Sequence, residues 1–136
     1  MSETNGKRFV TPDQVETQVF DWGSLKWMSE PRVTGAERFS AGVVLLAPGK
    51  GHESHNHPGV EEILYIISGT GEQMVGDERR QVGPGDLVHI PPDVYHETIN
   101  TGWDELKILA IYSPPGPEAE LRKMPGVQIV PPKSSG

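Results

Sequence analysis

The amino-acid sequence predicts an all-β fold, a sandwich or a barrel, in a single domain. Its apolar residues form short runs rich in β-branched and aromatic side chains, and each run ends at glycine, proline or another turn-forming residue. Gly (16) and Pro (13) make up about a fifth of the 136 residues, as closely spaced turns require. The runs recur about every 8–12 residues, a spacing typical of sandwiches and barrels.

Strands are expected where these runs occur. They are residues 20–29, with a break at Gly23, then 39–47, 61–68, 70–75, 81–82, 87–90, 95–100 and 106–112. The pair Gly76-Asp77 predicts a hairpin between two of these strands. Only residues 118–124 have a helical pattern, and Pro125 limits this helix to about two turns.

The order of these elements suggests three segments. They are an N-terminal arm with a covering strand (residues 1–32), a barrel (33–113) and a C-terminal tail with a possible short helix (114–136). Trp22 and Trp27 belong to the first segment. Their rings can cover one end of the core or pack in a dimer interface, where aromatic side chains are enriched. Covering the core is the favoured interpretation.

Composition excludes several classes of function. The chain has no cysteine, which rules out disulfides, thiolate metal ligands and a cysteine nucleophile. Its net charge of −7 and the lack of a basic stripe argue against nucleic acid as a partner. No apolar stretch approaches the ~20 residues that span a bilayer, so no membrane association is expected. The N-terminus lacks the apolar run of a secretory signal, and a cytoplasmic location is therefore predicted.

A histidine cluster is the strongest chemical signal. His52, His55 and His57 are three of the five histidines and lie within six residues. Because His55 and His57 are two positions apart, a strand would present both on one face. Neutral imidazoles with a carboxylate nearby are natural ligands for a first-row divalent metal. Glu61 and Glu62 both follow, and since the two faces of that strand are equally apolar, the local pattern leaves the choice between them open.

Other histidine patterns are interpreted as structural. His52 and Glu53 are expected to be solvated residues at the rim of the site, and His89 to have a packing or surface role. The string 52–55 resembles the start of a zinc-protease helix, but Asn56 occupies the position of the second histidine. The proline and glycine that follow at 58–59 would also end such a helix, so this motif is rejected.

The order of these residues resembles the cupin superfamily. The first cupin motif is matched by Gly49, His55, His57, Glu62 and Gly69, and the second by Gly85, Pro91, His96 and Asn100. One departure is visible, since Asp93 stands where the second motif has glycine. Aspartate tolerates the left-handed backbone region, so we expect the turn to survive.

The resemblance implies a double-stranded β-helix (jelly-roll) barrel of the cupin kind. It assigns His55, His57, Glu62 and His96 as metal ligands, and it selects Glu62 over Glu61. Four protein ligands on an octahedral ion leave two positions for water or substrate, an open site of the kind that metal catalysis needs. Cupins of this size are commonly dimers, so the resemblance also implies a homodimer.

Strand alternation adds two candidate substrate contacts, Gln73 and Tyr112. On residues 70–75, Gln73 is expected to face inward, where it contacts a substrate or, equally well, satisfies a backbone group. On residues 106–112, the exposed position of Lys107 turns Leu106, Ile108, Ala110 and Tyr112 inward. Tyr112 can donate a proton or a hydrogen bond near the rim, although packing is the favoured role.

These inferences predict a metal-dependent cupin enzyme that acts on a small organic molecule. The cofactor would be one divalent transition metal per chain, with Fe or Mn favoured and Ni, Co or Zn possible. An oxygenase, specifically a dioxygenase, is favoured over an isomerase, a decarboxylase or a lyase. Cupins include all of these classes and the fold does not choose among them, so the reaction type stays open. The alternatives are a non-catalytic module that binds or senses a small molecule and a structural barrel with an incidental metal.

Overall fold

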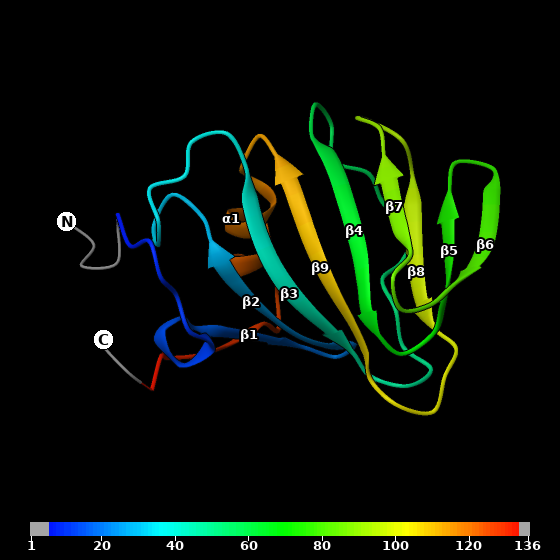
Figure 1. Ribbon diagram of the computed structural model, residues 1–136, viewed down its shortest axis with the longest axis horizontal. Helices are drawn as coiled ribbons and strands as arrows, with labels where there is room; N and C mark the ends of the chain where they lie inside the picture. The colour runs from blue at the N-terminus through cyan, green and yellow to red at the C-terminus, as the bar shows by residue number, and fades with distance from the viewer. Residues whose placement is uncertain (1–5, 134–136) are drawn as a thin grey trace.

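Two antiparallel β-sheets form the protein, whose computed structural model describes residues 6–133 (Figure 1). The larger sheet has the strand order β10-β1-β2-β3-β9-β4-β7, and the smaller has the order β6-β5-β8. The strands are β1 (Thr17–Phe20), β2 (Gly23–Ser29), β3 (Ser40–Leu46), β4 (Glu61–Ser68), β5 (Gly71–Val75), β6 (Glu78–Val82), β7 (Leu87–Ile90), β8 (His96–Asn100), β9 (Leu106–Ser113) and β10 (Gln128–Val130). A 3-10 turn covers Pro12–Gln14, and the helix α1 covers Pro117–Arg122. The predicted all-β, jelly-roll class is therefore confirmed.

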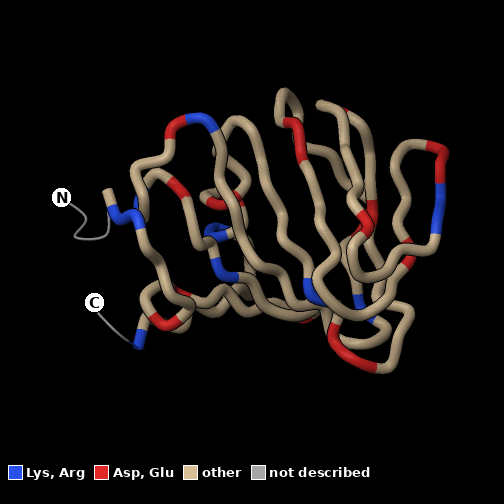
Figure 2. Tube along the Cα trace, viewed as in Figure 1, with Lys and Arg blue, Asp and Glu red and all other residues tan. Residues whose placement is uncertain are grey.

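The core lies between the two sheets and follows from strand alternation. Along β3 every second residue is buried, and β9 shows the same pattern in register with it. The inward residues expected on β9, from Leu106 to Tyr112, are all buried, while Lys107 is exposed. Such alternation lets one face of an antiparallel sheet cover the core while the other faces solvent. Figure 2 shows that charged residues are scarce along β3 and β9 and concentrate in loops and at strand ends.

The N-terminal hairpin differs from the single strand that was expected. β1 ends at Phe20 and β2 begins at Gly23, so residues 20–29 span a turn and two strands. Gly23 has φ of +153°, and a Cβ atom there would lie 1.8 Å from the carbonyl oxygen of Leu45. Only glycine fits this close approach of two backbones, which explains its place at the start of β2.

The sequence prediction shortened one further strand, β6, and missed another, β10. β6 begins at Glu78 rather than at residue 81, because a charged edge strand lacks the apolar alternation by which strands are recognised. β10 is three exposed residues long and pairs with β1. The predicted hairpin at Gly76-Asp77 is present, with Val75 opposite Glu78.

The indole of Trp27 covers the core, as expected. This residue is 1% exposed, and its ring packs against that of Tyr112 with centroids 5.4 Å apart. Its indole N–H donates to Oε1 of Gln18 at 3.3 Å. Trp22 is half-buried and stacks on Phe20, with ring centroids 4.6 Å apart.

The C-terminal segment docks on the barrel through α1. Leu121 packs against the core, and the guanidinium of Arg122 donates to Oε2 of Glu16 (2.8 Å) and to Oε2 of Glu30 (3.2 Å). The division of the chain into segments 1–32, 33–113 and 114–136 stays a prediction. Residues 1–5 of the first segment and 134–136 of the last lie outside the described residues. Between residues 6 and 133, no helix is long and apolar enough to cross a bilayer.

Candidate metal centre

Three histidines from two distant parts of the chain converge at one end of the barrel. His96 begins β8, and His55 pairs with it through two backbone hydrogen bonds, His55 N–H to His96 O at 3.0 Å and His96 N–H to His55 O at 2.8 Å. One ring nitrogen from each of His55, His57 and His96 lies within 4.8 Å of the others. Three histidines so close together could hold a metal ion.

The ring orientations of His55 and His96 suit ligation. Nδ1 of His55 lies 2.7 Å from the carbonyl oxygen of Glu53, and Nδ1 of His96 lies 3.0 Å from that of Val94. A carbonyl oxygen only accepts, so each Nδ1 carries the hydrogen and donates it. Each Nε2 therefore keeps a free lone pair, which is the arrangement that fixes metal-binding histidines.

The fourth group at this place is the carboxylate of Glu62. Its Oε1 lies 3.2 Å from Nε2 of His96 and 3.8 Å from Nε2 of His57, in both cases without hydrogen-bond alignment. All three atoms are buried, and none has a hydrogen-bond partner among residues 6–133. Each buried unsatisfied polar atom costs about 1–3 kcal/mol. A single cation between them would satisfy all three, so the donor set fits a divalent metal.

The structure distinguishes the two adjacent glutamates. Glu62 is 4% exposed and faces the histidines, whereas Glu61 is exposed on the outer face of β4. There the carboxylate of Glu61 contacts Nε2 of His89, which is itself exposed. The surface role expected for His89 is thus confirmed, and the sheet register turns Glu62 toward the interior.

The electrostatics of the cluster keep most of its imidazoles neutral. Burial lowers the pKa values of His55 and His57 below 6.5. Burial, together with the neighbouring imidazoles, lowers the pKa of His52 to about 3. His96 differs: burial alone would lower its pKa, but the Glu62 carboxylate outweighs burial and raises the pKa above 6.5. A second proton on His96 would bind at Nε2, so a proton and a metal would compete for the same lone pair.

A cavity of about 30 Å³ adjoins the cluster. It is lined by His52, His55, Glu62, His96, Thr98 and Tyr112 together with apolar residues of β3, β4 and β9. The expectation that His52 is a solvated rim residue is wrong, because its ring packs on Trp22 (centroids 4.1 Å apart) and lines this cavity. The run 52–57 gave no sign of this contact, since Trp22 comes from the turn between β1 and β2.

The two candidate substrate contacts lie in different places. Tyr112 is 8% exposed, lines the small cavity, and packs edge-on against His57 with ring centroids 5.4 Å apart. Burial and the Glu62 carboxylate raise its pKa well above 10, so the phenol keeps its proton. Gln73 faces inward as expected, but its amide oxygen accepts from the Thr98 hydroxyl and its amide nitrogen donates to the Met74 carbonyl at 3.1 Å.

Asp93 links its own loop, which precedes His96, to the loop that carries His55 and His57. Its φ of +71° is the left-handed conformation expected where the motif has glycine. Oδ1 of Asp93 accepts from the N–H of Gly59 at 3.0 Å, and its carbonyl accepts from the amide of Asn56 at 3.1 Å. The sequence marked Asp93 only as a departure, because the spacing showed nothing of these partners.

Comparisons with known proteins agree with this geometry. The chain matches the family described as Cupin domain over residues 42–112. Protein SchB of Streptomyces halstedii is 30% identical over 114 residues, which are 84% of this chain and 83% of that protein. Polyketide synthase CurC of Streptomyces cyaneus is 27% identical over 84% of this chain and 74% of its own length.

Solved structures show the same fold. KdgF from Halomonas sp. superimposes with a TM-score of 0.73 at 19% identity, covering 83% of this chain and 98% of that one. At this level of identity the likeness concerns the fold alone. Because the family match spans more than half of the 136 residues and includes His55, His57, Glu62 and His96, the chain belongs to the cupin domain family.

Proposed function

We propose that the protein is a metal-dependent enzyme acting on a small organic molecule, with His55, His57, Glu62 and His96 as the ligands of one divalent metal. The carrying observation is that the buried Nε2 atoms of His57 and His96 and Oε1 of Glu62 all lack a hydrogen-bond partner among the described residues and face one another. Buried polar groups are otherwise almost always satisfied. A structural role for these three side chains gives no reason for them to be left unpaired.

The donor set favours a first-row transition metal. Imidazole nitrogens suit Fe, Co, Ni and Zn, while a carboxylate oxygen also suits Mn. We propose iron or manganese, in keeping with an oxygenase, and this choice depends on the proposed reaction class rather than on the geometry. When bound, such an ion supplies Lewis acidity and, with dioxygen, redox chemistry.

The residues around the ligands have separable tasks. The phenol of Tyr112 keeps its proton, so it can donate a hydrogen bond to a substrate oxygen beside His57. His52 and the apolar side chains of β3 and β9 line this cavity and lower its polarity. In a site of low polarity, hydrogen bonds to developing negative charge are stronger than in water.

The size of this cavity and the names of similar proteins support a proposal for the substrate class. About 30 Å³ admits the reacting oxygen atoms of a substrate but not its whole body. CurC is named as a polyketide synthase, and the Thermotoga maritima relative of known structure as a predicted oxalate decarboxylase. Both names concern oxygen-rich organic molecules, and we propose a substrate that offers two oxygen atoms to the metal.

The same small volume favours a second candidate function. A cavity that holds little more than an ion and a water fits a non-catalytic binding or sensing module in which the metal itself is recognised. In that case metal binding would occur without turnover of any organic molecule. The two functions share the ligand set and differ in their response to a substrate panel.

The test combines metal analysis with a matched histidine control. Protein purified without chelator is analysed for bound metals, and oxygen uptake is followed with diphenols, diketones and oxo-acids. His96→Ala is expected to lose both metal and turnover, whereas His89→Ala, at an exposed histidine outside the cluster, should retain both. Metal binding without turnover would favour the sensing module. Failure of the protein to take up any divalent metal on reconstitution would refute both functions.

The homodimer stays a prediction. On the outer face of β4 and β7, Tyr65, Ile67 and Leu87 are 43%, 41% and 59% exposed. Tyr65 and Leu87 are direct cross-strand partners, so these side chains form one apolar area of the kind that oligomer contacts use. Analytical ultracentrifugation at micromolar concentration distinguishes a monomer of 14.9 kDa from a dimer.

A further inference from the structure

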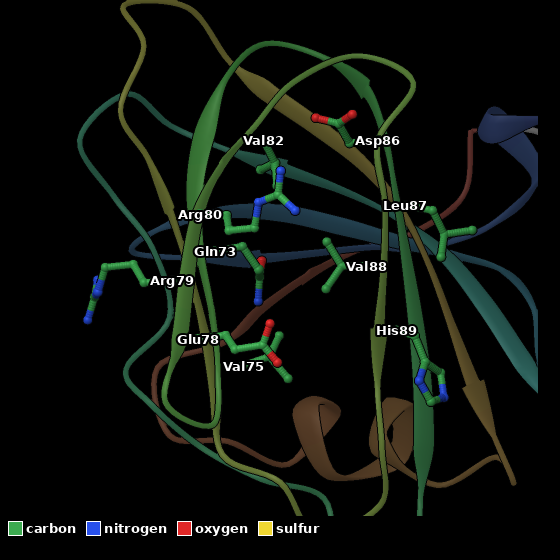
Figure 3. A pocket seen from close by; sticks show the side chains of 10 residues that line it. All are labelled: Gln73, Val75, Glu78, Arg79, Arg80, Val82, Asp86, Leu87, Val88 and His89. Carbon is green, nitrogen blue, oxygen red and sulfur yellow. The ribbon is translucent and has the colours of Figure 1, made fainter.

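A second and larger cavity opens between β6 and β7, away from the histidine cluster (Figure 3). Its volume is about 290 Å³, against about 30 Å³ beside the metal ligands. At roughly 30 Å³ per water molecule it has room for about ten waters. That volume is close to the lower end of the range for sites that bind small organic molecules.

Strand alternation on β6 decides which charges face this cavity. Figure 3 shows the side chains of Glu78 and Arg80 directed into the space between the strands, and that of Arg79 directed away from it. The Arg79 side chain already has a partner on the outer side, where its Nη1 donates to Oε1 of Glu72 at 2.9 Å. The guanidinium of Arg80, by contrast, has no hydrogen bond or ion pair with any residue of the described range 6–133. The cavity thus has an unpaired guanidinium on one wall.

The remaining walls combine an apolar surface with one buried amide. Val75, Val82 and Val88 contribute the apolar part. Gln73 is 3% exposed, and its amide nitrogen makes one hydrogen bond, to the Met74 carbonyl. A primary amide has two N–H donors, so one of them is left for a ligand. The lining thus combines polar and charged groups with a smaller set of apolar side chains, and polar groups placed beside apolar ones orient a small organic ligand.

These groups specify the chemistry of the ligand. The planar fork of a guanidinium matches a carboxylate in a bidentate arrangement. Two carboxylates also line the cavity, Glu78 and Asp86, and the latter accepts from the N–H of Gly83 at 2.8 Å. Their negative charge repels a dianion such as a phosphate monoester more strongly than a monoanion. The short apolar wall fits a hydrocarbon ring or chain next to the acid group.

We propose that the cavity between β6 and β7 is a binding site for a small organic monocarboxylate, whose acid group is held by Arg80 and whose body contacts Val75, Val82 and Val88. The site is separate from the metal ligands. The side chains of Gln73 and Thr98 form the wall between them, since Gln73 lines the larger cavity, Thr98 lines the smaller one, and the Thr98 hydroxyl donates to the Gln73 amide oxygen. The inference therefore does not depend on the proposed metal chemistry.

The test uses benzoate and hexanoate as probes, with neutral benzamide and dianionic phenyl phosphate for comparison. Binding to the full chain, as purified and after chelator treatment, is followed by the backbone amide shifts of β6 and β7 in nuclear magnetic resonance spectra. Arg80→Gln is compared with Arg79→Gln, which removes the same charge from the same strand on the opposite face. Glu78→Gln removes a repelling charge from the cavity itself.

Benzoate and hexanoate should change the backbone amide shifts of β6 and β7 both before and after chelator treatment. Benzamide should bind at least about tenfold more weakly than benzoate. Arg80→Gln should lower the affinity for benzoate about tenfold, whereas Arg79→Gln should lower it by less than about threefold. Glu78→Gln should raise the affinity for benzoate about two- to fivefold. Equal weakening by the two arginine variants would overturn the proposal. So would tighter binding of phenyl phosphate than of benzoate, loss of the shifts after chelator treatment, or no shifts up to about 50 mM of either acid.

Discussion

Nε2 of His96 lies 3.2 Å from Oε1 of Glu62, yet neither atom has a hydrogen-bond partner among residues 6–133. A third species placed between two such buried and unpaired groups would satisfy both of them. Histidine and carboxylate both ligate divalent metals, and the first two predictions test whether such an ion binds between them.

Glu62→Ala should lower the affinity for a divalent metal by about 100-fold or more, because even loss of a group that only orients a ligand costs about 10- to 100-fold. The affinity is measured by competition with a chromophoric chelator. Glu61→Ala is the matched control, since Glu61 is the adjacent carboxylate on the opposite face of β4 and should change the affinity by less than about threefold. Equal losses in the two variants would exclude Glu62 as a ligand.

Metal binding should also stabilise the fold. A ligand at 1,000 times its Kd adds about 4 kcal/mol to the free energy of unfolding. For a domain of this size that corresponds to a rise in Tm on the order of 10–20 °C. Calorimetry with and without a chelator measures the shift. The shift should persist in His89→Ala and vanish in His57→Ala, and a chelator-insensitive Tm would argue against a bound metal.

Asp93→Ala should destabilise the protein by about 2–3 kcal/mol. Roughly 1–2 kcal/mol comes from placing alanine at a φ of +71° and about 1 kcal/mol from the lost bond to the Gly59 N–H. Asp93→Gly should recover the backbone part but not the hydrogen bond, so its loss should be the smaller of the two. Urea unfolding gives both values. If alanine and glycine destabilise equally, the backbone conformation is not the cause.

The contribution of Glu30 to the free energy of unfolding should decrease as pH rises above about 4.5. Burial raises its pKa above the ordinary 4.5, and this outweighs the opposing charge of Arg122. The folded state then binds more protons than the unfolded state, so the contribution of Glu30 is most favourable below pH 4.5 and decreases as pH rises through its folded pKa.

Urea unfolding from pH 4 to 7 on the wild type and Glu30→Gln measures this difference. The stability of the wild type relative to the variant should decrease as pH rises across the window that begins near 4.5. Arg122→Gln should steepen the decrease, because it removes the cation that lowers the pKa of Glu30. A pH-independent difference between wild type and Glu30→Gln would contradict the assignment.

The fold was predictable because its signals are local. Alternation along residues 106–112 gave the correct inward face of β9, and Gly76-Asp77 gave the hairpin between β5 and β6. β6 was shortened in the prediction because Glu78, Arg79 and Arg80 are charged on both faces. A strand at the edge of a sheet is held by backbone pairing, which leaves no apolar pattern in the sequence.

The site was predictable only in part. Strand alternation placed His55 and His57 together, but the choice of Glu62 over Glu61 required the family spacing, since both faces of β4 are apolar. The contact of His52 with Trp22 and the ion pairs of Arg122 with Glu16 and Glu30 join residues far apart in the chain. Such contacts depend on tertiary packing, and no local pattern encodes them.

The backbone bridge between His55 and His96 has a consequence for when a metal could bind the proposed ligands. The segments that carry the two histidines are distant in sequence, so their ring nitrogens meet only after long-range strand pairing has closed the loop between them. An unfolded chain offers at most the short stretch around His55 and His57 to an ion. If these residues bind a metal, its uptake is therefore expected late in folding, and the nearly finished barrel, rather than the nascent chain, would select the ion.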